Sequence, residues 1–135
     1  EDAGAGPIAA PAAALLYDLL SLQAPAQAAL DHLRGITPLL PAIEPAVNRF
    51  ATRLDALRAR GIDTAALPFE ASLGRTTMEY YDGFTFAFVG PADLPPVASG
   101  GRYDALTAML GQGKSIPAVG GIIRPNLVAA LRGLA

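Results

Sequence analysis

The chain has 135 residues, 16% of them charged, and a net charge of −2, so it has the size of one domain and no basic stripe for binding a nucleic-acid backbone. Hydrophobic residues make up 52% of the sequence, yet Pro, Gly or a charge interrupts every apolar run before the roughly 20 residues needed to cross a bilayer. It contains no cysteine and no charged segment followed by an apolar core and cleavage site. We therefore predict a cytoplasmic protein that binds neither nucleic acid nor membrane.

Two further expectations come from the composition and the first residue. The high apolar content predicts that some apolar surface meets another chain. Because residue 1 is Glu rather than Met, we expect the chain to be a piece of a longer protein.

The first 64 residues are rich in Ala and Leu and predict three helices. Leucines repeat at helical spacing between two prolines, which predicts a helix over 11–23. A second helix is predicted over 25–34, with Gly35 as the left-handed residue after its last turn. The residues that this helix should bury are Ala29, Leu30 and Leu33.

The third helix has the clearest pattern, because its apolar residues step by three, four and three before Gly61 ends the run. These residues are Val47, Phe50, Leu54 and Leu57. The start of this helix stays open, since Pro38, Pro41 and Pro45 cannot all lie inside one regular helix. His32 is the single histidine, so no metal site of the Cys and His kind is expected.

After Gly61 the pattern changes to that of strands. Residues 67–73 predict a short edge strand, because Pro68 cannot donate a ladder hydrogen bond. Residues 76–90 predict the strongest strand, with bulky core side chains at even positions and small or polar ones at odd positions. Asp82-Gly83 also suits a two-residue type I′ turn, so a hairpin is the alternative to one bent strand.

The two faces of this strand have different expected roles. The bulky face is predicted to be core, and its residues are Met78, Tyr80, Phe84, Phe86 and Phe88. For the other face, solvent exposure and a floor for a small polar ligand remain equally open.

The remaining elements complete an α+β order with an antiparallel or mixed sheet. They are a short helix within 103–110 closed by Gly111, a connecting loop over 111–117, a buried strand over 118–123, and a helix from Pro125 that turns Leu127, Val128 and Leu131 inward.

Common catalytic and nucleotide motifs are missing. The segment "GQGKSIP" (111–117) fails as a phosphate loop because Ala108 stands where the first glycine is required. The sole histidine has no sequence link to a nucleophile, and Glu79 and Asp82 should face opposite sides of a strand. We therefore predict no catalytic residue, no metal site and no cofactor.

Three segments in order, "MEYYDGFTFAF", "ASGGRYDAL" and "PAVGGIIRPNLVAAL", resemble the C-terminal half of the histidyl-tRNA synthetase core. The synthetase patterns are Leu-Asp-Tyr-Tyr-Thr-Gly, Gly-Gly-Arg-Tyr-Asp-Gly-Leu and an Ala-Val-Gly-Phe strand before the third class II motif. The resemblance implies that residues 65–135 form the C-terminal half of a class II synthetase-like antiparallel sheet with flanking helices. Residues 1–64 would then be a helical, insertion-like segment before it.

The chain departs from the synthetase pattern at residues that bind ATP or assist adenylation. The synthetase motif ends in an arginine that grips ATP, and a gapless alignment places Leu127 there, with Arg124 three positions too early. An apolar side chain cannot offer the charged fork that a triphosphate needs. Arg75 is one residue too far from the tyrosines, and Ala87 replaces a carboxylate. The resemblance therefore predicts that adenylation is lost.

A chain that keeps the residues expected around the amino acid but lacks the arginine that grips ATP is similar to the regulatory subunits of ATP phosphoribosyltransferase. This resemblance implies a non-catalytic subunit that homodimerises within a hetero-oligomer with the short-form catalytic subunit, in the first step of histidine biosynthesis, with feedback regulation by histidine. The alternatives are a divergent histidyl-tRNA synthetase and a purely structural module.

The resemblance also implies a set of histidine-binding residues. They are Glu79, Tyr80, Tyr81, Gly100, Gly101, Arg102 and Tyr103. The glycine pair would let backbone approach a ligand or a neighbouring strand closely. Two alternatives stay open: Tyr80 is a core residue instead, or histidine binds at a subunit interface.

Overall fold

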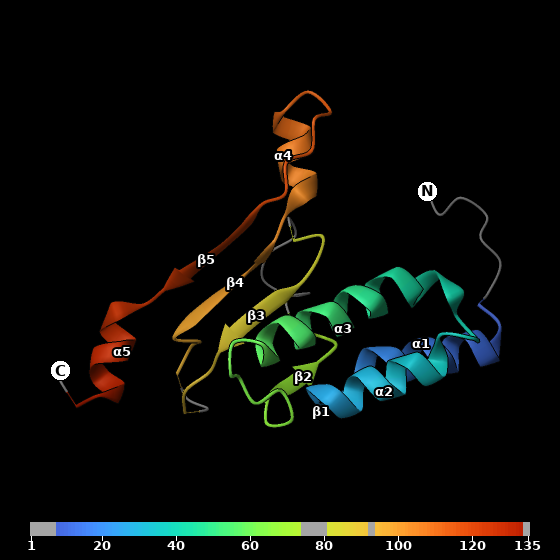
Figure 1. Cartoon of the computed structure of the whole chain (residues 1–135), viewed down its shortest axis with the longest axis horizontal. Coiled ribbons are helices and arrows are strands. Elements are labelled where there is room, and N and C mark those ends of the chain that lie inside the picture. The colour runs from blue at the N-terminus through green and yellow to red at the C-terminus, as the bar shows by residue number, and fades with distance from the viewer. Residues whose placement is uncertain (1–7, 74–80, 92–93, 134–135) are drawn as a thin grey trace. The chain divides into compact units, whose positions relative to one another are not determined.

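A computed structural model of the chain describes residues 8–73, 81–91 and 94–133 (Figure 1). The chain divides into two compact units, Glu1–Ser72 and Leu73–Ala135. The elements of the first unit are α1 (Ala10–Ser21), β1 (Gln23–Pro25), α2 (Ala26–Ile36), the 3₁₀ helix η1 (Pro41–Ile43), α3 (Glu44–Arg58) and β2 (Pro68–Glu70). Those of the second are β3 (Thr85–Phe88), β4 (Ala98–Arg102), α4 (Asp104–Leu110), β5 (Val119–Ile123) and α5 (Pro125–Leu131).

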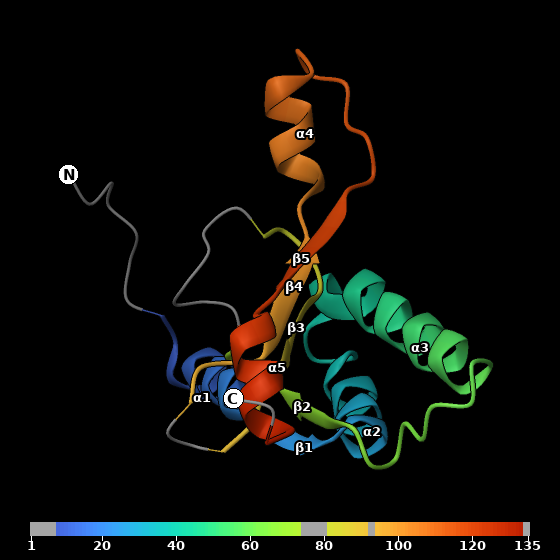
Figure 2. The ribbon, with the colours of Figure 1, turned by 90° about the vertical axis from the view of Figure 1, so that its left-hand side faces the viewer.

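The core of the first unit lies between α2 and α3, which run side by side (Figure 2). Apolar residues three and four apart on α2 form its buried stripe, as the spacing predicts. The buried side chains of the two helices are Ala26, Ala29, Leu30, Leu33 and Ile36 of α2 and Val47 and Leu54 of α3. The three predicted helices are therefore confirmed, together with most of their expected buried residues.

Gly35 departs from its predicted role. It lies inside α2 rather than after it, because the helix continues to Ile36, whose side chain is buried. Burying an Ile side chain is worth about 1.5–3 kcal/mol, more than the roughly 1 kcal/mol that a helical glycine costs. Packing therefore outweighs the local stop signal.

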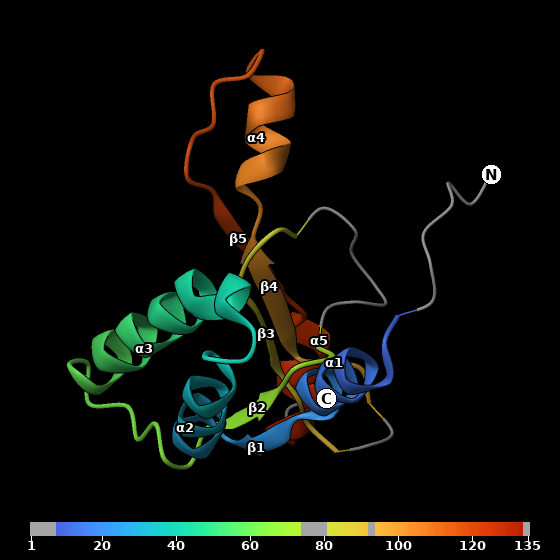
Figure 3. The same cartoon turned by 90° about the vertical axis from the view of Figure 1, so that its right-hand side faces the viewer.

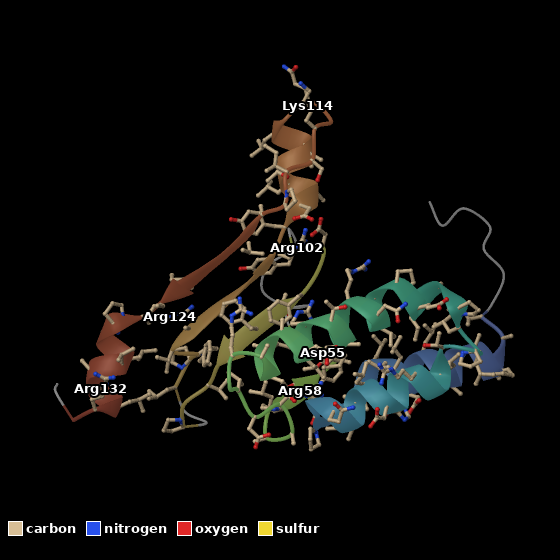
Figure 4. The ribbon with its side chains drawn as sticks, in the orientation of Figure 1. Asp55, Arg58, Arg102, Lys114, Arg124 and Arg132 are labelled. Carbon is tan, nitrogen blue, oxygen red and sulfur yellow. The ribbon has the colours of Figure 1, made fainter. Side chains whose placement is uncertain are left out.

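The prolines before α3 fall at the start of short segments. Pro41 is the first residue of η1, and Pro45 lies in the first turn of α3. The missing N–H of a proline costs nothing there, because N–H groups in the first turn have no partner within the helix. At the other end, Gly61 follows α3 as predicted, and its φ of +76° is the left-handed conformation that commonly ends a helix. Arg58 closes this end, since its Nε donates to the Thr64 hydroxyl at 2.9 Å and its Nη1 to Asp55 at 2.7 Å (Figure 4).

A two-stranded antiparallel ribbon of β1 and β2 completes the first unit (Figure 3). Ala24 pairs with Phe69, and the Phe69 ring packs on Phe50 of α3 with centroids 5.0 Å apart. The predicted strand over 67–73 is thus confirmed as β2. It belongs to the first unit, although it follows residue 64, because its pairing partner lies there.

The second unit is built on an antiparallel sheet of order β3-β4-β5. The strand predicted over 76–90 is shorter, Thr85–Phe88, and residues 74–80 lie outside the described ranges. The hairpin alternative is wrong, since neither Asp82 nor Gly83 has the positive φ that a type I′ turn needs. Instead Asp82 continues beside β4, and its N–H donates to the Arg102 carbonyl at 3.2 Å.

The burial expected of this sheet is wrong in several places. Phe84, Phe86 and Phe88 share a face with neighbouring rings 5.8 and 5.9 Å apart, but Phe88 is 66% exposed. The strand predicted over 118–123 exists as β5, yet its apolar side chains are exposed, as is Leu131 of α5. The reason is topological: β5 is an edge strand, and α4 and α5 extend beyond the strand ends rather than across the sheet (Figure 1).

A pair of glycine substitutions tests the packing of both units. A Cβ on Gly100 would strike the Gly120 carbonyl oxygen and the Gly121 Cα, both backbone atoms. We expect Gly100→Ala to lower the free energy of unfolding by about 1–3 kcal/mol or more. Helical Gly35 has open space around it, so Gly35→Ala should raise that free energy by about 0.5–1 kcal/mol. Urea denaturation followed by circular dichroism measures both, and a Gly100→Ala protein as stable as the parent would contradict the structure.

Candidate functional site

Two tyrosine rings cover two glycines on one face of the second sheet. Gly101 of β4 pairs with Gly120 of β5, so their missing side chains leave room on the same side. A Cβ on Gly101 would lie 2.8 Å from the Tyr81 ring, and one on Gly120 would lie 2.8 Å from the Tyr103 hydroxyl oxygen. The two ring centroids are 6.3 Å apart. We call this group of four residues the tyrosine face.

The opposite face of the same strands is covered by a phenylalanine. Gly100 pairs with Gly121, and both lie under Phe86 of β3. A Cβ on Gly100 would be 2.8 Å from the Phe86 ring, and one on Gly121 would be 3.1 Å from it. The Gly-Gly pair thus serves close approach to a neighbouring strand and to aromatic rings of the same chain.

The residues implied to bind histidine are only partly brought together. Tyr81, Gly101 and Tyr103 share the tyrosine face. Gly100 lies on the other side of the sheet, under Phe86. Glu79 and Tyr80 lie outside the described residues. Histidine binding by this set stays a prediction.

Arg102 is held by a carboxylate of its own chain (Figure 4). Its Nε donates a hydrogen bond to one oxygen of Asp104 at 2.8 Å, and its Nη2 forms an ion pair with the same oxygen at 2.6 Å. The other Asp104 oxygen accepts the N–H of Ala118 at 2.8 Å. The Arg102 side chain also packs along Gly83, where a Cβ would lie 3.2 Å from it.

Asp82 adds a second carboxylate to this network. Its Oδ1 accepts the N–H of Asp104 at 3.1 Å, and its Oδ2 accepts the N–H of Ala105. These donors open α4, where helix N–H groups have no partner within the helix. We call Asp82, Arg102 and Asp104 the carboxylate clasp.

Sequence reasoning missed the clasp. The sequence places Asp82 either in a bent strand or in a type I′ turn, and it places Asp104 only near the start of a helix. The available signal was an acidic residue in the first turn of a predicted helix, which favours a capping or charge role near an N-terminus. The partner that caps α4 is 22 residues away in the chain, and no local pattern reveals it.

Asp104 has a lowered pKa. The main cause is the hydrogen bond from the Ala118 N–H, and the hydrogen bond and positive charge of Arg102 add to it, while desolvation opposes them. The ionised form is therefore favoured in the folded chain.

Arg124 lies in the region aligned with the ATP-binding motif and is hydrogen-bonded to two backbone carbonyls of its own chain. Nη1 of Arg124 donates to the Pro96 carbonyl at 2.6 Å, and its N–H donates to the Val97 carbonyl at 2.8 Å (Figure 4). Leu127 is half-buried in α5.

Outside the tyrosine face and the clasp, the described residues show no further cluster of the predicted site residues. His32 of α2 forms a 2.9 Å contact with Asp18 of α1. In residues 8–73, 81–91 and 94–133, no group of three His, Cys, Asp or Glu side chains is placed to hold a metal ion. A hollow in the first unit is lined by residues 23–25 and 66–70, none of them a predicted site residue. No helix in these ranges is long and apolar enough to span a membrane.

Comparison with known proteins shows the family of the chain. Residues 2–127 match the protein family described as "Histidyl-tRNA synthetase". The ATP phosphoribosyltransferase regulatory subunit of Agrobacterium fabrum is 34% identical over 120 residues, which are 88% of this chain and 32% of that protein. The protein of the same name from Mesorhizobium japonicum is 36% identical over 87 residues, which are 64% of this chain and 23% of that protein.

A solved structure supports the fold. The histidyl-tRNA synthetase from Nostoc sp. PCC 7120 matches with a TM-score of 0.73 and 22% identity, over 95% of this chain and 31% of that one. The predicted class II synthetase-like α+β fold is therefore confirmed. The chain spans about a quarter to a third of the length of these proteins.

The lowered pKa of Asp104 gives a pH test. A carboxyl group whose pKa is depressed on folding adds stability above its unfolded value, and this stability is lost as the pH falls through the folded value. We expect Asp104→Asn to be less stable than the parent at pH 7, with the difference shrinking as the pH falls below the ordinary value of 3.8. Thermal unfolding across this range measures it. A difference that does not change with pH would contradict the proposed cause.

Proposed function

The chain belongs to the histidyl-tRNA synthetase family, and we propose that it forms part of a non-catalytic regulatory subunit of ATP phosphoribosyltransferase. The observation that carries this proposal is the 34% identity, over 88% of the chain, to the A. fabrum protein of that name. The role would lie in the first step of histidine biosynthesis. The partner would be the short-form catalytic subunit, in a hetero-oligomer in which this subunit also dimerises.

The absence of an ATP-gripping arginine supports a non-catalytic role. Leu127 occupies the position that the synthetase pattern gives to this arginine. Arg124 has its guanidinium bonded to the Pro96 carbonyl. Without a charged fork, stabilisation of the triphosphate during adenylation would be weak.

The tyrosine face supports histidine as the regulatory ligand. Phenol rings offer faces on which an imidazole ring can stack, and they also attract the cationic imidazolium form. The glycines below them keep the floor of this face low. Feedback would then be a coupling free energy between this site and the catalytic partner, typically about 1–3 kcal/mol.

Complex formation tests the proposal. We expect the full protein to co-elute with a short-form ATP phosphoribosyltransferase catalytic subunit, to raise its activity, and to make that activity sensitive to histidine. The catalytic subunit alone is the control. If no complex forms and the activity does not change, the proposal is wrong.

A divergent histidyl-tRNA synthetase is the second candidate, favoured by the match to the synthetase family. Its signature is histidine-dependent exchange of pyrophosphate into ATP. We expect no exchange, and measurable exchange by the full protein would favour the synthetase. Calorimetry with histidine separates the third possibility, a structural module, which would bind the partner but give no heat with histidine.

A further inference from the structure

Asp82 stands where the synthetase pattern Leu-Asp-Tyr-Tyr-Thr-Gly has Thr. Its two carboxylate oxygens each accept one backbone N–H, from Asp104 and from Ala105. The residue at the helix start, Tyr103, makes no side-chain cap of its own. The beginning of α4 is therefore fastened by a residue from a distant segment of the chain.

The position of this bond in the sequence connects it to the tyrosine face. Asp82 directly follows Tyr81, and Asp104 directly follows Tyr103. The hydrogen bond from the Asp104 N–H to the Asp82 carboxylate thus joins the residues that follow the two tyrosines. A second hydrogen bond runs from the Asp82 N–H to the Arg102 carbonyl. The backbones that carry both rings are tied together within one residue of each ring.

We infer that Asp82 is a positioning residue for the tyrosine face, which fixes the separation of the two rings and so the affinity for a ligand bound against them. This inference rests on the proposed function for the identity of that ligand, histidine. Asp82 acts through Tyr81 and Tyr103, whose centroids lie 6.3 Å apart. It need not touch the ligand.

The other members of the clasp show what a carboxylate at position 82 contributes. The Asp104 side chain is already occupied by Arg102 and by the Ala118 N–H, so it cannot turn back to cap its own helix. A carboxylate has two oxygens, so each can accept one N–H, whereas a threonine hydroxyl would have to accept both on a single oxygen. The negative charge also suits a helix N-terminus.

Substitutions at position 82 test the inference in the full protein. We expect Asp82→Ala to weaken histidine binding about tenfold or more in calorimetry, and Asp82→Asn, which keeps one acceptor oxygen, to weaken it less. The matched control is Asp63→Ala, which removes another exposed aspartate that accepts a backbone N–H, from Ala65 at 3.0 Å in the first unit. This control should bind histidine as the parent does.

A second readout does not depend on histidine. In the parent we expect a nuclear Overhauser contact between the Tyr81 and Tyr103 rings, which Asp82→Ala loses while far-ultraviolet circular dichroism shows a folded chain. If Asp82→Ala does not fold, Asp82→Asn takes its place.

The outcomes separate the two claims. A parent protein that binds no histidine, but whose ring contact depends on Asp82, defeats the proposed ligand and leaves the positioning role supported. Histidine affinity within twofold of the parent together with an intact ring contact in Asp82→Ala overturns the positioning role, whatever the ligand.

Discussion

Two pairs of glycines that face each other across β4 and β5 determine the architecture of the second unit. On each face of the sheet, one of these pairs leaves space where side chains would otherwise stand, and aromatic rings fill that space. The pairs are Gly100 with Gly121 and Gly101 with Gly120. Glycine loses more backbone freedom on folding than any other residue, so this arrangement persists only because ring packing offsets that cost. A methyl group at Gly100 would meet backbone atoms.

The same constraint links the fold to the proposed function. Because the tyrosine rings lie on glycine, their positions are set by the backbone beside them, and that backbone is fastened by the carboxylate clasp. The clasp also pairs Arg102 with Asp104, so the cation of the Gly-Gly-Arg-Tyr-Asp segment has a structural partner. Under the proposed function, this aromatic face, together with Leu127 at the position that the gapless alignment gives to the ATP-gripping arginine, would suit a subunit that senses an amino acid better than one that activates it.

The parts of the structure that depend on local pattern were predictable. Helical spacing located α1, α2 and α3, and Gly61 ended its helix as expected. The errors arose where a distant partner decides. Gly35 stays helical because Ile36 is buried. The apolar side chains of β5 are exposed because neither α4 nor α5 lies across them (Figure 1). Asp82 caps a helix that begins more than 20 residues further along the chain. Motif resemblance found the fold because it carries this long-range information.

The contact between the Tyr103 ring and Gly120 is the most direct place to test this arrangement. In a nuclear magnetic resonance spectrum, we expect Overhauser contacts from the ring protons to a Gly120 Hα, and an upfield shift of that Hα relative to helical Gly35, which has open space around it. A Gly120 Hα without ring contacts and without such a shift would show that the tyrosine does not lie on the glycine floor.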